Sequence, residues 1–283
     1  MTRVLVTGVG GPAGRSLAET LRDRGLAVSG VDMADARQAG IRFRQVPAAG
    51  DSGFLHALYG IAAEHGVGLI VPTVTEEMLM LAAADRAGAP VVVSSLAAIT
   101  VAHDKWLTYL RLWDAGVAVP RSCLGGAAAA ALADRGATLL SKPRTGRGGR
   151  GVRVHRPGEQ GILRFDDTRI VQEFAPGTEY AVNLYLAARQ EDDVVEVLEK
   201  TELANGEVGN AVAVRAVVEP DVALLARVAA SVVGITGPAD VDIRRRADGT
   251  PVVLEVNPRL GAHNGRTPAV VDALLAEHAA VAR

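Results

Sequence analysis

The sequence predicts an α/β fold in which a Rossmann-like domain with a parallel sheet precedes a two-lobed α+β domain. Over the first hundred residues, short β-branched runs alternate with helical patterns, as is typical of a parallel sheet. The pattern changes after Pro120, and the segment from Ile170 to Leu203 is mostly strand-like, broken by the turn at Ala175-Pro176-Gly177. We therefore expect domains over 1–100, 101–174 and 175–283, the last two forming the two lobes.

The individual elements follow from hydrophobic periodicity and from the turn residues that flank each run. The first domain should hold strands at Arg3–Val6, Ala27–Val31, Leu69–Val71 and Val91–Val93, and helices at Pro12–Arg24, Phe54–Glu64 and Glu76–Ala87. The later elements should be a helix at Ala127–Asp134, a strand at Thr138–Ser141, strand-like sequence over Ile170–Leu203, a helix at Asp221–Val233 and strands at Ala239–Arg244 and Pro251–Val256. The turn Ala247-Asp248-Gly249 joins the last two strands, which predicts a β-hairpin.

The composition excludes several classes of protein. Hydrophobic residues make up 49% and charged residues 22%, as in ordinary globular proteins, and the formal net charge of −2 predicts no binding to nucleic acid or to a membrane surface. The single cysteine, Cys123, excludes an intramolecular disulfide, and with six histidines it forms no zinc-ligand spacing. No signal peptide precedes the first strand and no apolar stretch is long enough to span a bilayer, so we expect a cytoplasmic protein.

The basic residues are strongly biased toward arginine. The chain has 27 arginines and only three lysines, Lys105, Lys142 and Lys200. A solvated surface position accepts arginine, whereas a site that needs a compact, strongly hydrated ammonium group does not. The three lysines are therefore candidates for binding or catalysis.

A glycine-rich segment, Thr7–Gly14, follows the first predicted strand and opens the first predicted helix. It fits the dinucleotide fingerprint with Ala13 at its third position, and Asp32 ends the second strand where a ribose-binding acid would lie. An oxidoreductase or epimerase that uses NAD(P) is therefore an alternative. The same geometry also binds other anions, because a helix N-terminus attracts any anion.

A second glycine-rich segment, Ser141–Gly151, begins with Lys142 at the end of a strand and continues as a basic loop. Backbone N–H groups exposed by glycines can surround phosphate oxygens, which Lys142 could also reach. It is not a P-loop, because no Gly-Lys-Ser/Thr follows.

The predicted hairpin carries acidic residues on otherwise apolar strands. Glu255 and Asn257 lie two residues apart and share a face, and folding at the Asp248-Gly249 turn brings Asp242 opposite them. Two carboxylates and an amide oxygen are ligands that suit Mg²⁺ held together with phosphates.

These residues together resemble the ATP-grasp superfamily, and within it the carbamoyl-phosphate-synthetase-like branch of carboxylate–amine ligases. The resemblance extends over essentially the whole chain, with 1–100 as the domain that precedes the ATP-grasp lobes. Its landmarks are His103-Asp104-Lys105, Lys142-Pro143 with its glycine loop, Val171–Phe174 followed by Gly177–Tyr180, and Leu254–Arg259.

The resemblance implies a role for each matching residue. Lys105 and Lys142 would contact the ATP phosphates, and Asp242, Glu255 and Asn257 would bind Mg²⁺, with Mn²⁺ as the alternative. The lid over the phosphates would be the loop that contains Thr145, Gly146, Gly148, Gly149 and Gly151. The nucleoside would be held by the backbone of Glu173 and Phe174, the carboxylate of Glu179 on the ribose and the side chain of Leu254 on the base. Catalytic contacts to the phosphoryl group or substrate would come from Arg259, Lys142 and Lys200. No sequence motif supports the role of Lys200.

The substrate would lie beyond the metal ligands. Gly10 and Gly11 would offer helix N–H groups to an acidic substrate, and Thr73 and Glu76 follow a strand at the same sheet edge, where ligands bind in open α/β folds. Gly261, His263 and Asn264 would line the acceptor pocket, with His263 in a positioning or structural role rather than as a base.

We therefore expect an ATP-dependent ligase that converts a small carboxylic or amino acid to an acyl phosphate, lets an amine or another nucleophile displace phosphate, and releases ADP and phosphate. The alternatives are the NAD(P)-dependent enzyme and a nucleotide-binding protein without turnover, for which a damaged metal set would be expected; here Asp242, Glu255 and Asn257 are all present. The expected partners are small-molecule carboxylate and amine substrates, and the sequence leaves a homodimer open.

Overall fold

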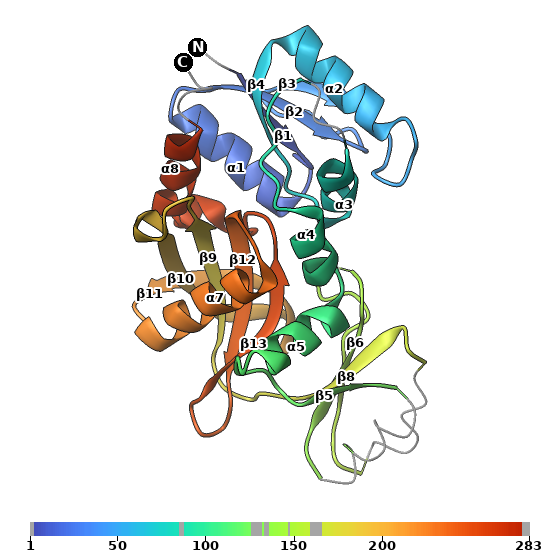
Figure 1. Cartoon of the computed structure of the whole chain (residues 1–283), viewed down its shortest axis with the longest axis vertical. Helices are drawn as coiled ribbons and strands as arrows, with labels where there is room; N and C mark the ends of the chain where they lie inside the picture. Colours follow the sequence, from blue (N-terminus) through green and yellow to red (C-terminus); the bar gives the residue numbers. More distant parts are fainter. Residues whose placement is uncertain are drawn as a thin grey trace.

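In the computed structural model, the chain is described over residues 3–84, 88–125, 132, 136–146, 148–158 and 166–278. These residues form three β-sheets that follow one another along the sequence (Figure 1). We name them sheets A, B and C. No helix among the described residues is both long and apolar enough to cross a membrane.

Sheet A is the parallel sheet that the alternating pattern predicts, in the order β3-β2-β1-β4. Its two faces are covered by different helices, because successive side chains of a strand point to opposite sides: Val4 and Val6 pack with α1, and Leu5 packs with α2. The strands are β1 (Arg3–Thr7), β2 (Ala27–Asp32), β3 (Arg42–Gln45) and β4 (Val67–Val71), and the helices are α1 (Pro12–Asp23), α2 (Phe54–His65) and α3 (Thr75–Ala83).

Three elements predicted before residue 135 differ from the structure or lie partly outside the described residues. The strand expected at Val91–Val93 is wrong: Val91 forms one parallel bridge with Ile70, after which the chain leaves the sheet. The reason is local, since Ser95 accepts a hydrogen bond from the amide of Ala98 and so starts helix α4 (Leu96–His103). Helix α3 ends at Ala83, earlier than expected, and residues 85–87 lie outside the described residues, as does the helix expected at Ala127–Asp134 apart from its helical residue 132.

Sheet B is a small antiparallel sheet in the order β5-β8-β6-β7. Its strand β6 ends in Lys142-Pro143, so the glycine loop leaves the edge of this sheet as the sequence predicts. The strands are β5 (Ser122–Leu124), β6 (Leu139–Pro143), β7 (Arg153–His155) and β8 (Arg169–Glu173).

Sheet C is the larger antiparallel sheet, in the order β11-β10-β9-β12-β13. The expected hairpin is confirmed as β12 and β13. The strand-like run expected over Ile170–Leu203 contains three strands: β8 before the turn Ala175-Pro176-Gly177, and then two strands of sheet C that are separated by residues 187–193. The strands are β9 (Glu179–Leu186), β10 (Val194–Asn205), β11 (Val208–Val217), β12 (Gly237–Arg245) and β13 (Pro251–Asn257).

Helices cover one face of sheet C completely and the other only in part. Helices α4, α5 (Lys105–Asp114) and α7 (Pro220–Val233) build the main core against the first face (Figure 1). On the second face, helix α8 (Pro268–Glu277) packs between α1 and strands β9 and β10, through an apolar cluster that includes Leu17, Leu274 and Tyr185. The rest of this second face carries polar residues and faces a cavity.

Candidate active site

The alternation of strand β12 places one apolar row in the core and one charged row in the cavity. The core row is Ala239, Val241 and Ile243. Asp240, Asp242 and Arg244 lie between them and point to the other face, where they line a cavity of about 360 Å³. The same cavity is lined by residues of sheet B and by the glycine loop of the first domain, so all three parts of the chain meet there.

The hairpin brings together the predicted metal ligands. Asp242 pairs with Glu255 across the two strands, and Asp240 pairs with Asn257. The Asn257 Nδ2 donates to the main-chain oxygen of Asp240 at 3.3 Å, so its Oδ1 is the end left to accept or to ligate. Over the described ranges no cluster of three or more His, Cys, Asp or Glu side chains is arranged as a metal site. The set is thus two carboxylates and an amide, the oxygen donors that Mg²⁺ accepts beside phosphates.

All three lysines of the chain reach this hairpin. The Nζ of Lys105, at the start of α5, lies 2.9 Å from Glu255 Oε1 and donates to the carbonyl oxygen of Gly146 at 2.8 Å. The Nζ of Lys142 donates to the carbonyl oxygen of Leu254 at 2.9 Å. Burial lowers the pKa of Lys142 to about 8, although the nearby Glu255 carboxylate opposes that shift.

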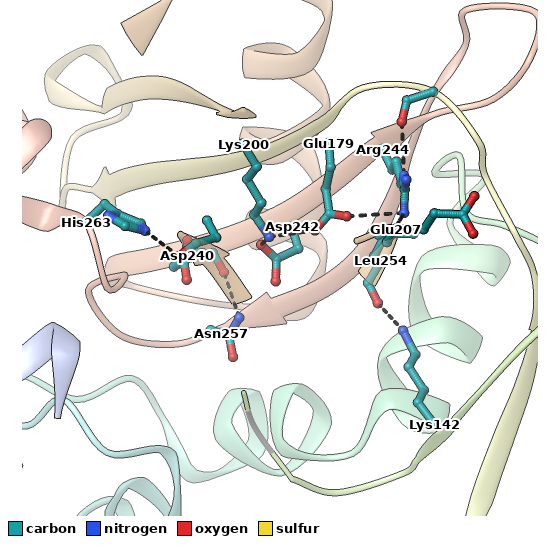
Figure 2. A network of polar contacts seen from close by, with 12 residues as sticks. Lys142, Glu179, Lys200, Glu207, Asp240, Asp242, Arg244, Leu254, Asn257 and His263 are labelled. Carbon is teal, nitrogen blue, oxygen red and sulfur yellow. Dashed lines mark hydrogen bonds and ion pairs between the residues drawn. The ribbon is translucent and has the colours of Figure 1, made fainter. Parts of the chain in front are cut away.

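Lys200 is held between two carboxylates of neighbouring strands. Its Nζ lies 2.7 Å from Glu179 Oε1 and 2.7 Å from Asp242 Oδ1, and its side chain is only 7% exposed. Burial disfavours its charge, but the carboxylates of Asp242 and Glu179 outweigh burial and raise its pKa. Figure 2 shows Lys200 between these two acids, with Arg244 on the far side of Glu179 at 3.4 Å.

One end of the cavity has the character expected for a base and ribose. Phe174 and Leu254 line it, and the Arg244 guanidinium lies over the Phe174 ring at 4.6 Å from its centroid. The backbone N–H groups of Glu173 and Phe174 already donate to the carbonyls of Arg121 and Thr138, both at 2.9 Å. These two N–H groups could donate to an adenine only if those bonds opened.

The predicted lid contributes two of its glycines to the cavity wall. Gly148 and Gly149 line it, whereas Thr145, Gly146 and Gly151 lie outside the wall. Gly149 has φ +66° and sits against the β10–β11 turn, so that an added Cβ would lie 2.9 Å from Gly209 Cα. The loop therefore closes onto sheet C at a point that tolerates only glycine.

The opposite end of the cavity is formed by the first domain and the segment after β13. Gly11, Thr73, Arg259 and His263 line it, whereas the other predicted substrate residues lie outside the wall: Gly10, Glu76, Gly261 and Asn264. The Nε2 of His263 lies 3.3 Å from the carbonyl oxygen of Ala211, and burial lowers its pKa. This contact fits the expected structural role of His263.

Two residues of this end were missed at the sequence level, Asp240 and Asn183. Arg259 Nη1 lies 3.4 Å from Asp240 Oδ2, and Asn183 Oδ1 accepts from the amide of Gly261 at 3.1 Å. Burial, and next the negative charge of Asp242, raise the pKa of Asp240 to about 6. The period of two along β12 was a signal that could have found Asp240, because it shares the face of Asp242. The same period along β9 marks Asn183, because it shares the face of the predicted Glu179.

The glycine loop of the first domain has the close packing that its sequence indicates. A Cβ on Gly14 would lie 2.3 Å from the carbonyl oxygen of Gly8. The acid expected to hold a dinucleotide ribose, Asp32, accepts hydrogen bonds from the amides of Gly10 and Ala34, at 2.9 and 3.0 Å, and lies outside the cavity wall. The loop thus faces the same cavity as Lys142 and Lys200, while Asp32 stabilises the loop itself.

Comparison with known proteins agrees with this geometry. Residues 102–263 match the family model of the ATP-grasp domain, and no curated protein sequence matches the chain. Among solved structures, an L-amino acid ligase from Bacillus licheniformis is 19% identical with a TM-score of 0.64, covering 94% of this chain and 69% of that one. A biotin carboxylase from Campylobacter jejuni is 15% identical with a TM-score of 0.71, covering 97% and 70%. An N5-carboxyaminoimidazole ribonucleotide synthetase from Thermotoga maritima is 18% identical with a TM-score of 0.61, covering 92% and 69%. At these identities the three structures establish a shared fold.

Proposed function

The chain belongs to the ATP-grasp superfamily of ATP-dependent ligases, and from this premise we propose that it activates a small carboxylic acid as an acyl phosphate for attack by an amine. The observation that carries the proposal is the convergence of all three lysines on the β12–β13 hairpin. Ammonium groups and hard oxygen donors then face one another in one cavity, as a site for a polyphosphate with a divalent ion requires. Residues 101–174 and 175–283 would be the two lobes around ATP.

The ATP would lie along the cavity from the Phe174 end toward Arg259. Phe174 and Leu254 supply apolar surface for the base, and Glu179 lies nearest to where the ribose hydroxyls would be. Lys105 and Lys142 would exchange their present oxygen partners, Glu255 and the Leu254 carbonyl, for phosphate oxygens. Such an exchange keeps each ammonium group paired, so the desolvation of its charge is compensated in both states.

The hairpin acids fit a divalent cation. Asp242 and Glu255 each lie within 3 Å of a lysine ammonium group, and both side chains line the cavity. Asp242, Glu255 and the amide oxygen of Asn257 would hold Mg²⁺. When bound, the ion would neutralise charge on the phosphate oxygens during transfer.

The transfer itself asks the protein mainly for position and charge. A substrate carboxylate oxygen would attack the γ-phosphorus of ATP, breaking its bond to the bridging oxygen of ADP. Arg259, at the far end of the cavity, would bind the carboxylate and the acyl phosphate formed from it. Gly148 and Gly149 would exclude water, which otherwise hydrolyses the acyl phosphate. An amine would then displace phosphate.

Hydroxylamine trapping tests this proposal, because hydroxylamine converts any acyl phosphate to a hydroxamate with release of phosphate. The purified chain is incubated with Mg-ATP, hydroxylamine and a panel of small carboxylic and amino acids, and ADP and hydroxamate are quantified. We expect both products from at least one acid in equal amounts. If no acid accelerates ADP release, the ligase proposal is wrong.

The metal ligands provide the matching variants. Asp242→Asn and Glu255→Gln should each lower kcat by at least about a hundredfold, because each removes a charge that would hold the ion at the transferring phosphoryl group. Circular dichroism should show an unchanged fold. Glu199→Gln, which alters a carboxylate on the surface of sheet C paired with Arg215, is the control and should keep wild-type turnover. Near-wild-type activity of both site variants would contradict the metal assignment.

A further inference from the structure

A polar row crosses sheet C beside the proposed metal ligands. Asp240 on β12 pairs with Asn183 on β9 and with Asn257 on β13, so the three side chains form one row across the sheet. Asp240 and Asn183 line the cavity, and they are 8% and 0% exposed. A buried row of this kind requires that its polar atoms find partners.

Two atoms of the row have no partner within the described part of the chain. One is the acceptor Oδ1 of Asp240 and the other is the donor Nδ2 of Asn183. The other side-chain oxygens of these two residues are engaged: Asp240 Oδ2 faces Arg259 at 3.4 Å, and Asn183 Oδ1 accepts from the amide of Gly261. The site therefore needs one further hydrogen-bond donor, preferably a charged one, and one further acceptor. Leaving these two buried atoms without hydrogen bonds costs free energy.

The position of the row relative to the phosphates is fixed by strand geometry. Asp240 precedes Asp242 by two residues on the same face, which corresponds to roughly 7 Å along the strand. Asp242 pairs with Glu255, where the phosphates would be held, and the base would lie on the opposite side of that pair. The polar row therefore lies one pair of facing residues beyond the position of the γ-phosphate, where the carboxylic acid that receives the phosphoryl group must bind.

We propose that the substrate is an α-amino acid, whose ammonium group binds the Asp240 carboxylate while its carboxylate is held by Arg259. The assignment rests on the proposed ligase function and narrows its substrate class. The ammonium group supplies the charged donor that Asp240 Oδ1 lacks, and a carboxylate oxygen supplies the acceptor that Asn183 Nδ2 lacks. Asp240 and Arg259 lie side by side with opposite charges, as do the two ionic groups of an amino acid.

Hydroxy acids distinguish recognition of the amine from a merely structural role of Asp240. A 2-hydroxy acid has the shape of the corresponding amino acid but no positive charge. In hydroxylamine trapping with the wild-type chain, twenty L-amino acids, their D-enantiomers and the corresponding 2-hydroxy acids serve as probes. We expect the preferred amino acid to exceed its hydroxy counterpart about a hundredfold in kcat/KM, because the hydroxy acid leaves Asp240 Oδ1 without the charged donor that an ammonium group supplies.

The variant Asp240→Asn should reduce this preference about a hundredfold, mainly through a higher KM for the amino acid, and should leave the Kd of Mg-ATP within threefold. A residue that only held Arg259 in place would weaken amino and hydroxy acids alike and keep their ratio. The control, Asp248→Asn, makes the same change at the exposed turn of the same hairpin and should leave the ratio unchanged.

Three results would overturn the inference. They are equal use of the amino acid and its hydroxy counterpart by the wild-type chain, an unchanged ratio in Asp240→Asn, and no hydroxamate from any amino acid. The first and third need no variant, so the inference stays testable if Asp240→Asn does not fold. ADP release with acids that lack an amine but with no amino acid would reject the amino acid alone, whereas no ADP release with any acid would reject the ligase proposal itself.

Discussion

Replacing Lys200 by methionine should destabilise sheet C strongly, because this buried lysine bridges the buried carboxylate of Glu179 and the half-buried carboxylate of Asp242. Each Nζ–oxygen distance is 2.7 Å, for which the attraction is about 6 kcal/mol per pair at an effective dielectric constant of about 20. Desolvation of the buried ions offsets much of this. Removing the lysine then costs about 3–5 kcal/mol, since the two carboxylates lose the ammonium group between them, while Glu179 keeps Arg244 at 3.4 Å.

The chain carries its own probe for this measurement. Both tryptophans, Trp106 and Trp113, lie on α5, which packs on α7 against sheet C, so their fluorescence in urea reports the unfolding of this lobe. The control is Arg215→Met on the adjacent strand β11, whose pair with Glu199 is also 2.7 Å long but exposed. The urea midpoint of Arg215→Met should be close to that of the wild-type chain, because exposed ion pairs contribute little stability.

The pH dependence gives a second criterion. The pKa of Lys200 is higher in the folded chain than in the unfolded chain. The stability that its charge contributes is therefore complete below the pKa of the unfolded state and is lost only at strongly alkaline pH. Between about pH 5.5 and 7.5 the contribution of Lys200 to wild-type stability should be constant. In Lys200→Met, Glu179 and Asp242 face each other without their cation, so protonation of one relieves the repulsion and the variant should gain stability as pH falls. If Lys200→Met loses no more free energy of unfolding than Arg215→Met does, the reasoning is wrong.

Two further predictions concern the phosphate end of the site. The pKa of Lys142 is lowered to about 8, so the folded chain releases this proton at a lower pH than the unfolded chain does. The stability of the fold should therefore rise with pH above about 8. Over the same range kcat/KM for ATP should fall about tenfold per pH unit, because the ammonium group is lost. In Lys142→Arg, turnover should be severely impaired at every pH and that decline absent, as a pH profile of ADP release will show. Gly149→Ala should lower kcat/KM for ATP about tenfold, because its Cβ would meet Gly209 Cα at 2.9 Å at a positive φ. Gly158→Ala, at φ +86° with no atom within 4 Å, isolates the effect of φ, and equal losses in the two variants would contradict a lid that closes at Gly149.

Local patterns predicted much of this protein because the physics behind them is local. The pairing of Asp242 with Glu255 follows from a two-residue side-chain period and the Asp248-Gly249 turn, both contained in one hairpin. The parallel sheet follows from alternation within the first hundred residues. The strand expected at Val91–Val93 failed where two local signals competed, since the Ser95 cap starts a helix before a strand can extend.

Other features depended on pairings between distant segments. Helices α4 and α5 were not expected, and they are stabilised by packing on α7 more than a hundred residues later. The partners of Lys200 depend on the order β10-β9-β12, because Lys200 on β10 reaches Glu179 on the neighbouring strand β9 and Asp242 on β12, one strand further. No window of sequence contains that order, because strand order is set by the burial of both sheet faces rather than by propensity.

The sequence by itself determined the chemistry of the site: the scarcity of lysine singled out three ammonium groups, and the hairpin alternation singled out the acids they meet. Only the tertiary structure decided which ammonium group meets which oxygen, and that Asp240 and Asn183 lie together with one acceptor and one donor that no described residue partners. The physical reason is that residue type and side-chain period are properties of a segment. A buried atom's lack of a partner, by contrast, is a property of everything that packs around it.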